Sequence, residues 1–461
     1  MTYHVLHGDC RTLMADMEGC SVDAIVTDPP YGLEFMGREW DAPWKQTAGG
    51  FSAPGIGERA TAWPSYLGSN RSRCAGCKKL VGQGGSPCRC EQPKPVLQDA
   101  ERMRLFQDWC QSWAVEALRV LKPGGWMAAF GGSRTYHRMA CAIEDAGFEI
   151  RDQIMWIYGS GFPKGGNRDG KGTCLKPAHE PIVLARKPLI GSVARNEAAF
   201  GTGALNIDDC RVATLDELRA GTGAIPMRHD PETPRGRVGE ASADRRYREN
   251  GSTDFAAKPG PRGGSELGRW PANVVHDGSP DVVGAFPDAP GQQGDLRNHG
   301  NSRQSPNGIF GGMRPALDHP ARGDAGTAAR FFYCAKASKA DRDEGFDQFE
   351  PQAFVQYQTG NGESGAASSL SAGRDTQYRN THPTVKPEAL MRWLVRLVTP
   401  PHGTVLDPFT GSGSTGKAAM LERRSFIGCE LTADYLPIAD ARIAAAYDRA
   451  ACSRDLFGDA A

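Results

Sequence analysis

The chain has 461 residues, which is longer than a typical single domain, so one large core with an insertion, or two to three units, is expected. Lys plus Arg and Asp plus Glu both number 54, and this balance excludes a histone-like coating protein but leaves room for a local basic groove. We find no secretory signal and no apolar stretch of about 20 residues, which predicts a soluble, cytoplasmic protein without membrane contact.

Residues 1–31 predict a strand, a short helix and a second strand. The stretches 3–7 and 23–27 have the pattern of short strands, and residues 13–17 between them have a helical pattern. Because such short connections favour neighbouring strands, we expect the two strands to lie side by side in a parallel sheet.

The second strand ends at Asp28-Pro29-Pro30-Tyr31. Two consecutive prolines cannot continue a central strand, since neither donates a ladder hydrogen bond and each fixes φ. The strand end therefore presents a carboxylate, a free carbonyl and an aromatic ring, at the edge of an α/β sheet where ligands bind. An ordinary exit from strand to loop is the simpler interpretation of the same residues.

Regular patterning is lost over about residues 40–98, an insertion that carries Cys74-x-x-Cys77 and Cys88-x-Cys90. Four thiolates at this spacing would close a tetrahedral structural zinc site in a loop too poor in apolar residues to pack alone. Free thiols are the alternative, because C-x-C is a less usual spacing than C-x-x-C. The 13 cysteines of an intracellular chain favour either interpretation over disulfides.

Helices and strands alternate again from residue 99 onward. Apolar residues recur with helical spacing over 99–121, followed by a strand at 125–130, a helix at 136–146 and strands at 148–158 and 182–185. Without the cysteine insertion, the first 190 residues therefore form an alternating α/β unit.

Residues 191–330 have few apolar runs, scattered Gly and Pro, and a group of arginines interleaved with acids. The arginines are Arg235, Arg237, Arg245, Arg246 and Arg248. One interpretation is a solvated loop face, and the other is a nucleic-acid-facing module whose arginines meet phosphates or guanine edges. Residues 330–335 predict a strand that returns to the core, and 338–380 a polar linker.

The last segment is regular. A helix with an apolar face over 390–398 precedes a strand at 403–407, the turn Asp407-Pro408-Phe409-Thr410-Gly411-Ser412-Gly413, a helix through residue 420, a strand at 425–430 and a helix near 435–447. Glu430 ends the second of these strands, about 20 residues after Asp407, where an acid can bind both hydroxyls of a ribose. This order predicts an adenosyl or dinucleotide site.

Four motifs, in the permuted order of the family, resemble those of the class β DNA amino-methyltransferases. Gly8-Asp9-Cys10 resembles the family's adenine-contacting strand end, residues 28–31 its catalytic motif, and residues 407–413 its cofactor motif. Residues 382–387 resemble the segment that helps to hold the methionine part of the cofactor, within which we expect a structural role for His382.

The resemblance implies an α/β fold, namely a Rossmann-like S-adenosylmethionine-dependent methyltransferase fold. The fold would be circularly permuted, with a loop-rich target-recognition insertion. Residues 1–190 would form the catalytic half, 191–330 the target-recognition region, and 331–461 the linker and the S-adenosylmethionine-binding half.

The resemblance also implies a cofactor site. Its residues would be Asp9, Cys10, Thr384, Lys386, Asp407, Phe409, Gly411, Ser412, Gly413 and Glu430. Asp9 would accept from the adenine amino group and Glu430 would bind the ribose. Thr384 and Lys386 would meet the methionine carboxylate, although a solvated lysine at a helix start is the alternative for Lys386. Phe409 and the glycine backbone would shape the pocket.

The implied catalytic residues are Asp28, Pro29, Pro30 and Tyr31. The Asp28 carboxylate and the Pro29 carbonyl would accept the two hydrogens of an exocyclic amine, so that its lone pair can attack the methyl group in line. Tyr31 would stack on a base flipped out of the duplex. Asp rather than Ser at the first position favours adenine N6 as the target.

Three other functions stay open at this point. They are methylation of the N4 amino group of cytosine, DNA binding without catalysis, and methylation of RNA or of protein glutamine. The expected partner is double-stranded DNA. A separate restriction enzyme, a phage or bacterial origin, and a homodimer are compatible with the resemblance.

Overall fold

The computed structural model describes residues 1–33, 41, 73–74, 89, 95–96, 99–161, 169–172, 174–213, 267–288, 326–335, 340–346, 352–353, 377–378, 380, 382 and 384–457. The chain divides into two compact units. The first contains Met1–Asn206, Asn273–Gly278 and Ala335–Ala461, and the second contains Ile207–Ala272 and Ser279–Cys334. The three functional segments predicted from the sequence remain a prediction beside this division.

The first unit is an α/β structure. Its elements are β1 (Tyr3–His7), α1 (Cys10–Ala15), β2 (Val22–Thr27), β3 (Arg73–Cys74), β4 (Pro95–Val96), α3 (Asp99–Val120), β5 (Leu121–Phe130), α4 (Tyr136–Asp145), β6 (Glu149–Ile157), β7 (His179–Arg186), α5 (Val193–Phe200), β8 (Val274–His276), α8 (Ala340–Asp343), β10 (Gln352–Ala353), β11 (Gln377–Tyr378), α9 (Glu388–Val398), β12 (Thr404–Asp407), α10 (Ser414–Leu421), β13 (Ser425–Glu430), η7 (Ala433–Tyr435) and α11 (Leu436–Phe457).

One mixed sheet organises this unit, with strand order β1-β13-β12-β2-β5-β7-β6-β8. The first five strands in this order, β1, β13, β12, β2 and β5, are all parallel. Strand β7 is antiparallel to both β5 and β6, and β8 is parallel to β6. The expectation that β1 and β2 are neighbours is wrong. The carboxy-terminal strands β12 and β13 lie between them, because in this permuted chain the last strands complete the middle of the sheet.

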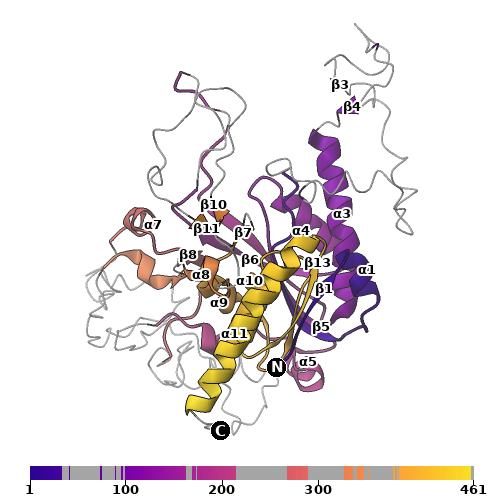
Figure 1. Cartoon of the computed structure of the whole chain (residues 1–461), viewed down its shortest axis with the longest axis vertical. Helices are drawn as coiled ribbons and strands as arrows, with labels where there is room; N and C mark the ends of the chain where they lie inside the picture. Colours follow the sequence, from indigo (N-terminus) through magenta and orange to yellow (C-terminus); the bar gives the residue numbers. More distant parts are fainter. Residues whose placement is uncertain are drawn as a thin grey trace, which may run out of the picture. The chain divides into compact units, whose positions relative to one another are not determined.

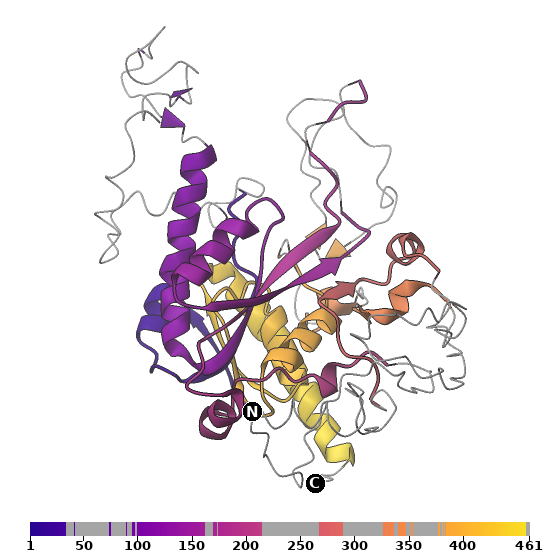
Figure 2. The same ribbon diagram turned by 180° about the vertical axis from the view of Figure 1, so that it is seen from behind.

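Helices cover both faces of the sheet (Figures 1 and 2). The helices α1, α3 and α4 pack together on one side, and α9, α10 and α11 pack together on the other. Every residue of β2 is buried, as expected for a central parallel strand covered on both faces. The apolar residues of this strand, Val22 and 24–26, are fully buried for this reason.

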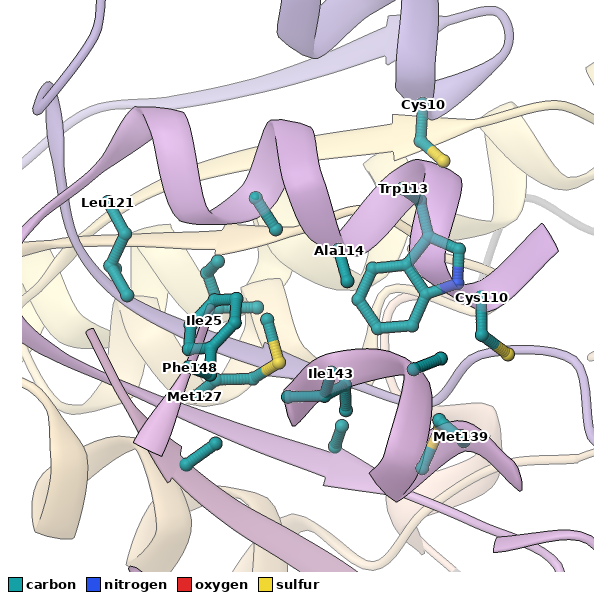
Figure 3. Close-up of a cluster of buried hydrophobic side chains, with 14 of the residues drawn as sticks. Cys10, Ile25, Cys110, Trp113, Ala114, Leu121, Met127, Met139, Ile143 and Phe148 are labelled. Carbon is teal, nitrogen blue, oxygen red and sulfur yellow. The ribbon is translucent and has the colours of Figure 1, made fainter. Parts of the chain in front are cut away.

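The larger core lies under α3 and α4 (Figure 3). Trp113 and Ala114 of α3 are fully buried, as are Ile25 of β2 and Met127 of β5, and all belong to one apolar cluster. Apolar side chains recur every three or four residues along α3, which is the period that places them on one helix face. Burial of this stripe fixes α3 against the sheet edge from which Asp28 emerges.

The second unit contains η5 (Asp208–Cys210), α7 (Pro280–Ala285), η6 (Ala328–Phe331) and β9 (Tyr333–Cys334). The predicted strand at 330–335 is therefore shorter than expected. A 3-10 turn precedes it, and its start is capped by the Thr327 side chain, which accepts from the backbone N–H of Ala329 at 3.3 Å. The arginines predicted to face nucleic acid, at 235–248, lie outside the described residues.

Among the described residues, no helix is long and apolar enough to cross a membrane. In the same residues, no group of three or more His, Cys, Asp or Glu side chains is arranged to hold a metal ion. Cys77, Cys88 and Cys90 lie outside the described residues, and only the backbone of Cys74 is described, in β3. The four-cysteine zinc site stays a prediction.

Candidate functional site

Four acidic residues mark the carboxyl ends of four adjacent parallel strands. Asp9 follows β1, Asp28 follows β2, Asp407 ends β12 and Glu430 ends β13. The register pairs His7 with Glu430, so these strands end at the same edge of the sheet. Parallel strands bring their carboxyl ends together, and ligands of open α/β sheets bind there.

These acids line one cavity of the first unit. The residues predicted for the site that line it are Asp9, Cys10, Asp28, Pro30, Thr384, Lys386, Asp407, Phe409, Gly411, Ser412 and Glu430. Further lining residues that the sequence did not single out include Trp109, Met391, Thr415, Thr432 and Tyr435. Segments from both ends of the chain thus form a single site.

Asp28 lies at one end of this cavity, within a network of charged and polar groups. Its Oδ1 accepts a hydrogen bond from the Tyr31 hydroxyl at 2.8 Å, and its Oδ2 lies 2.8 Å from Lys386 Nζ. The carboxylate of Glu180, on β7, lies 3.1 Å from the same Nζ. The Thr135 hydroxyl donates to the Tyr31 carbonyl at 2.7 Å, which fixes the chain after the two prolines.

The cation in this network stays charged. Burial lowers the pKa of Lys386, but Asp28 and Glu180 outweigh burial and raise it above its ordinary value. Burial, followed by the charges of Asp28 and Glu180, raises the pKa of Tyr31 well above its ordinary value. The phenol is therefore a hydrogen-bond donor, and the lysine is an ammonium held between two carboxylates.

A second group of contacts surrounds the glycine turn. The Glu430 carboxylate accepts from the backbone N–H of Gly411 and of Thr432, both at 2.7 Å. Burial raises the pKa of Glu430 although these two N–H groups lower it. Glu430 thus joins the end of β13 to the turn after β12, with its carboxylate at the cavity wall.

Asp407 accepts hydrogen bonds from the neighbouring strand β2 and from the turn that follows β12. Its Oδ1 accepts from the Thr27 hydroxyl at 2.6 Å and from the backbone N–H of Phe409 at 3.0 Å. Burial raises the pKa of Asp407 to about 6, opposed by hydrogen bonds from Thr27, Thr415 and the Phe409 backbone. This contact links the strand that precedes Asp28 to the glycine turn.

Phe409 forms an apolar wall of the cavity. Its ring lies 5.5 Å from the ring of Trp109 and 5.5 Å from that of Trp113, the latter edge to face. Such offset and edge-to-face contacts add to the gain from burial. The wall therefore joins the glycine turn to α3, which belongs to the other half of the unit.

Asp9 and Cys10 occupy the end of the cavity near β1. Asp9 caps α1 by accepting from the backbone N–H of Arg11, and its carboxylate is 2.6 Å from the Arg11 guanidinium. Burial raises the pKa of Asp9, but the hydrogen bonds and charge of Arg11 outweigh it and lower that pKa. Burial raises the pKa of the Cys10 thiol well above its usual value, so Cys10 is no thiolate nucleophile.

A family model described as DNA methylase, for the N6/N4 enzymes, matches residues 22–441 of the chain. The chain belongs to this DNA methylase family. The predicted membership is confirmed, and with it the Rossmann-like methyltransferase fold of the sheet, in permuted order.

Curated relatives of the chain match shorter stretches. The type II methyltransferase M.HindIII of Haemophilus influenzae is 26% identical over 140 residues, which is 30% of this chain and 38% of the relative. The DNA adenine methyltransferase YhdJ of Escherichia coli is 45% identical over 60 residues, 13% of this chain and 20% of YhdJ. The type II methyltransferase M.ScaI of Streptomyces caespitosus is 38% identical over 74 residues, 16% and 24% of the two chains. The matches thus span between 20% and 38% of these relatives.

Two solved structures align over nearly the whole chain but with low scores. M1.HpyAVI, in complex with SAM, is 14% identical, with 96% of this chain and 100% of that chain covered and a TM-score of 0.34. The cytosine-N4-specific PvuII DNA methyltransferase is 12% identical, with 98% and 93% covered and a TM-score of 0.39. Similarities at these TM-scores add nothing to the family assignment.

Some residues of the site had no usable signal in the sequence. Glu180 is a single acid inside the strand β7, and Arg442 is one of three arginines in α11. The Arg442 guanidinium is 1% exposed and donates to the Ser412 carbonyl at 2.6 Å and to the Ser414 hydroxyl at 3.0 Å. Only the fold brings these side chains to the motifs that the sequence identified.

Gly413 gives a test of how closely the turn is packed. Its φ is +76°, and a Cβ there would lie 2.9 Å from backbone atoms of Ala439. Gly201 has a similar φ of +73° with nothing within 4 Å of the same position. We expect G201A to cost about 1–2 kcal/mol of unfolding free energy from backbone strain alone. We expect G413A to cost about 1–3 kcal/mol more, because α11 must also shift.

Urea denaturation of both glycine variants measures this difference. Because the two positions share a backbone conformation, G201A is the matched control for G413A. Equal losses in the two variants would contradict close packing of the turn against α11. Cofactor affinity should fall in G413A and stay unchanged in G201A.

His382 predicts a pH dependence of stability. Burial lowers its pKa to about 4, opposed by a hydrogen bond to the Thr384 carbonyl at 2.6 Å. Between pH 4 and the ordinary value of about 6.5, the unfolded chain binds a proton that the folded chain excludes. The stabilisation is therefore complete above pH 6.5 and is lost as the pH falls to about 4.

We expect this histidine to contribute up to about 3 kcal/mol to the change in unfolding free energy across that window. The H382Q variant should show a correspondingly flatter pH dependence in chemical denaturation. H4Q, which replaces an exposed histidine, is the matched control. A slope in H382Q equal to that of the unaltered chain would contradict the burial of a neutral imidazole.

Proposed function

We propose that this chain is a DNA methyltransferase that transfers a methyl group from S-adenosylmethionine to the N6 amino group of adenine in duplex DNA. One observation carries the proposal: Asp28 and Pro30 line the same cavity as Gly411 and Ser412 of the glycine turn and as Glu430. Membership of the N6/N4 DNA methylase family supports the same conclusion.

The residues around the glycine turn fit the cofactor. Glu430 and Asp9 are carboxylates at the cavity wall, suited to accept from ribose hydroxyls and from an adenine amino group. The Phe409 ring offers an apolar face, and at Gly411 (φ +50°) any Cβ would approach His382 Nε2 to 3.0 Å. When bound, S-adenosylmethionine supplies a methyl group activated by a sulfonium.

Residues of the motif at 28–31 would make the exocyclic amino group of the target base more nucleophilic. An exocyclic amino nitrogen is a weak nucleophile, because its lone pair is delocalised into the ring. The Asp28 carboxylate would accept one of its hydrogens and the Pro29 carbonyl the other, which turns the nitrogen toward tetrahedral geometry and frees the lone pair. Prolines suit this position, because their fixed φ holds the carbonyl in place. Positioned polar groups would supply most of the acceleration.

The target base must leave the helical stack to reach Asp28. Tyr31 would stack on the flipped base, and its ring centroid lies 5.6 Å from Lys386 Nζ. The proposed recognition of duplex DNA by the middle of the chain agrees with an exposed aromatic side chain in the second unit. There the Arg211 guanidinium lies over the Trp270 ring at 5.3 Å, and Trp270 is 65% exposed.

Adenine is favoured over cytosine by two observations. The acid Asp28 stands at the first motif position, where the family resemblance associates Asp with adenine. In addition, YhdJ, which is 45% identical over 60 residues, is named a DNA adenine methyltransferase. Methylation of cytosine N4 is the second candidate, because the matching family model covers both reactions. A separate restriction enzyme remains the proposed partner in the cell.

Nucleoside analysis tests the function directly. The purified chain is incubated with S-adenosylmethionine and unmethylated duplex DNA, and the digested DNA is analysed by mass spectrometry. N6-methyladenine is the expected product. N4-methylcytosine would overturn the base assignment but keep the mechanism. No product on several genomic DNAs, with cofactor binding intact, would overturn DNA as the substrate.

A further inference from the structure

A second carboxylate lies beside Asp28 that the mechanism above does not use. Glu180 lies on β7, and its Oε2 is 3.1 Å from Lys386 Nζ and 3.2 Å from the Tyr31 hydroxyl. The same two groups contact Asp28, Nζ at Oδ2 and the hydroxyl at Oδ1, both at 2.8 Å. Glu180 is therefore a second acceptor for both donors that occupy Asp28.

This arrangement matters because both oxygens of Asp28 are already engaged. A target amine needs an Asp28 lone pair directed at its N–H, and on either oxygen it competes with the donor already there. The Lys386 side chain is 8% exposed. An unpaired ammonium at such a site costs several kcal/mol, so Lys386 can leave Asp28 only if another carboxylate takes it.

We propose that Glu180 is a positioning residue that takes Lys386 and the Tyr31 hydroxyl from Asp28 when the target amine binds. The inference rests on the proposed function and deepens it. Both donors already lie within hydrogen-bond distance of Glu180, so the exchange requires rotation of side chains only. Asp28 keeps its negative charge and gains a free lone pair for the amine.

The charges around Lys386 come from several elements. The titratable groups that face it are Asp28 and Tyr31 after β2, Tyr158 after β6, Glu180 on β7, and His382 before α9. Asp28 and Glu180 are the carboxylates among them. Without Glu180, Asp28 is the one carboxylate left to oppose the effect of burial on the pKa of Lys386. That pKa falls, and the Lys386 ammonium loses its proton at lower pH.

The E180Q variant tests the exchange, since glutamine keeps the size of the side chain and removes its charge. We expect kcat to fall at least about 10-fold, with the cofactor Kd unchanged and the alkaline limb of the kcat profile moved to lower pH. E180D, which restores the charge, should recover part of the rate. E149Q, on the neighbouring strand β6, is the matched control, because Glu149 pairs with Arg186 instead.

A rate in E180Q within about twofold of the unaltered chain would overturn the inference. A second measurement needs neither DNA nor cofactor: acetylation of Lys386 by acetic anhydride as a function of pH, followed by mass spectrometry. Its midpoint should fall in E180Q and not in E149Q. If the chain methylates no DNA, the proposed function fails, and an unchanged midpoint then overturns the role of Glu180 as well.

Discussion

Replacing Asp28 by asparagine is expected to lower kcat for methyl transfer by at least about 100-fold, a typical loss for one preorganised polar group. Asparagine keeps the size of the side chain but offers one acceptor oxygen in place of two. Lys386, which lies 2.8 Å from the carboxylate, would compete for that oxygen with the target amine. The lone pair of the amine then stays delocalised into the ring.

The same variant should still bind the cofactor. Glu430 and the glycine turn contact each other and not Asp28, so the dissociation constant measured by calorimetry should stay within about threefold. D145N, at an exposed acid at the end of α4, controls for the loss of a negative charge. Normal methylation by D28N would show that the catalytic assignment is wrong. Lost activity together with lost cofactor binding would indicate damage to the pocket instead.

The strands and the motifs at their ends were accessible from the sequence. Residues 24–26 are apolar because both faces of β2 are buried, and the prolines after Asp28 end the strand by removing ladder donors. The same logic located Glu430, since β13 has a strand pattern that ends in an acid. These features are local, so a single stretch of sequence contains them.

The neighbours of these motifs were not accessible, because they depend on long-range packing. The order of the sheet places β12 beside β2, so the Thr27 hydroxyl reaches Asp407 across 380 positions of sequence. Nothing in the local pattern of either strand specifies this pairing. Glu180 and Arg442 belong to no recognisable motif of β7 or α11, and their roles follow only from the residues that the fold places next to them.

Lys386 illustrates the difference between a motif and its surroundings. The sequence placed it in the segment expected to meet the methionine carboxylate, with a solvated position as the alternative. In the structure its side chain is 8% exposed and pairs with Asp28 and Glu180. The role toward the cofactor stays a prediction, and the observed contacts add a link to the Asp28 carboxylate.

Replacing Glu430 by glutamine is expected to weaken cofactor binding by about 10- to 100-fold, the loss of one to two charge-assisted hydrogen bonds. The carboxylate accepts from the N–H groups of Gly411 and Thr432. A glutamine side chain has one acceptor and one donor group, so one of these N–H groups would face another donor. The glycine turn then loses its anchor, and a ribose loses a charged acceptor.

The pH dependence of binding distinguishes this role from a general effect on the fold. Burial raises the pKa of Glu430, so its charged form, and with it the affinity for the cofactor, is lost as the pH falls through that raised value. E430Q should lack this step. Any step that remains near pH 6 belongs to Asp407, whose pKa burial raises to about 6. D434N, at an exposed acid in the next turn, is the matched control. Unchanged affinity in E430Q would remove the ribose assignment, while lower affinity with an unchanged acid step would assign that step to Asp407 alone.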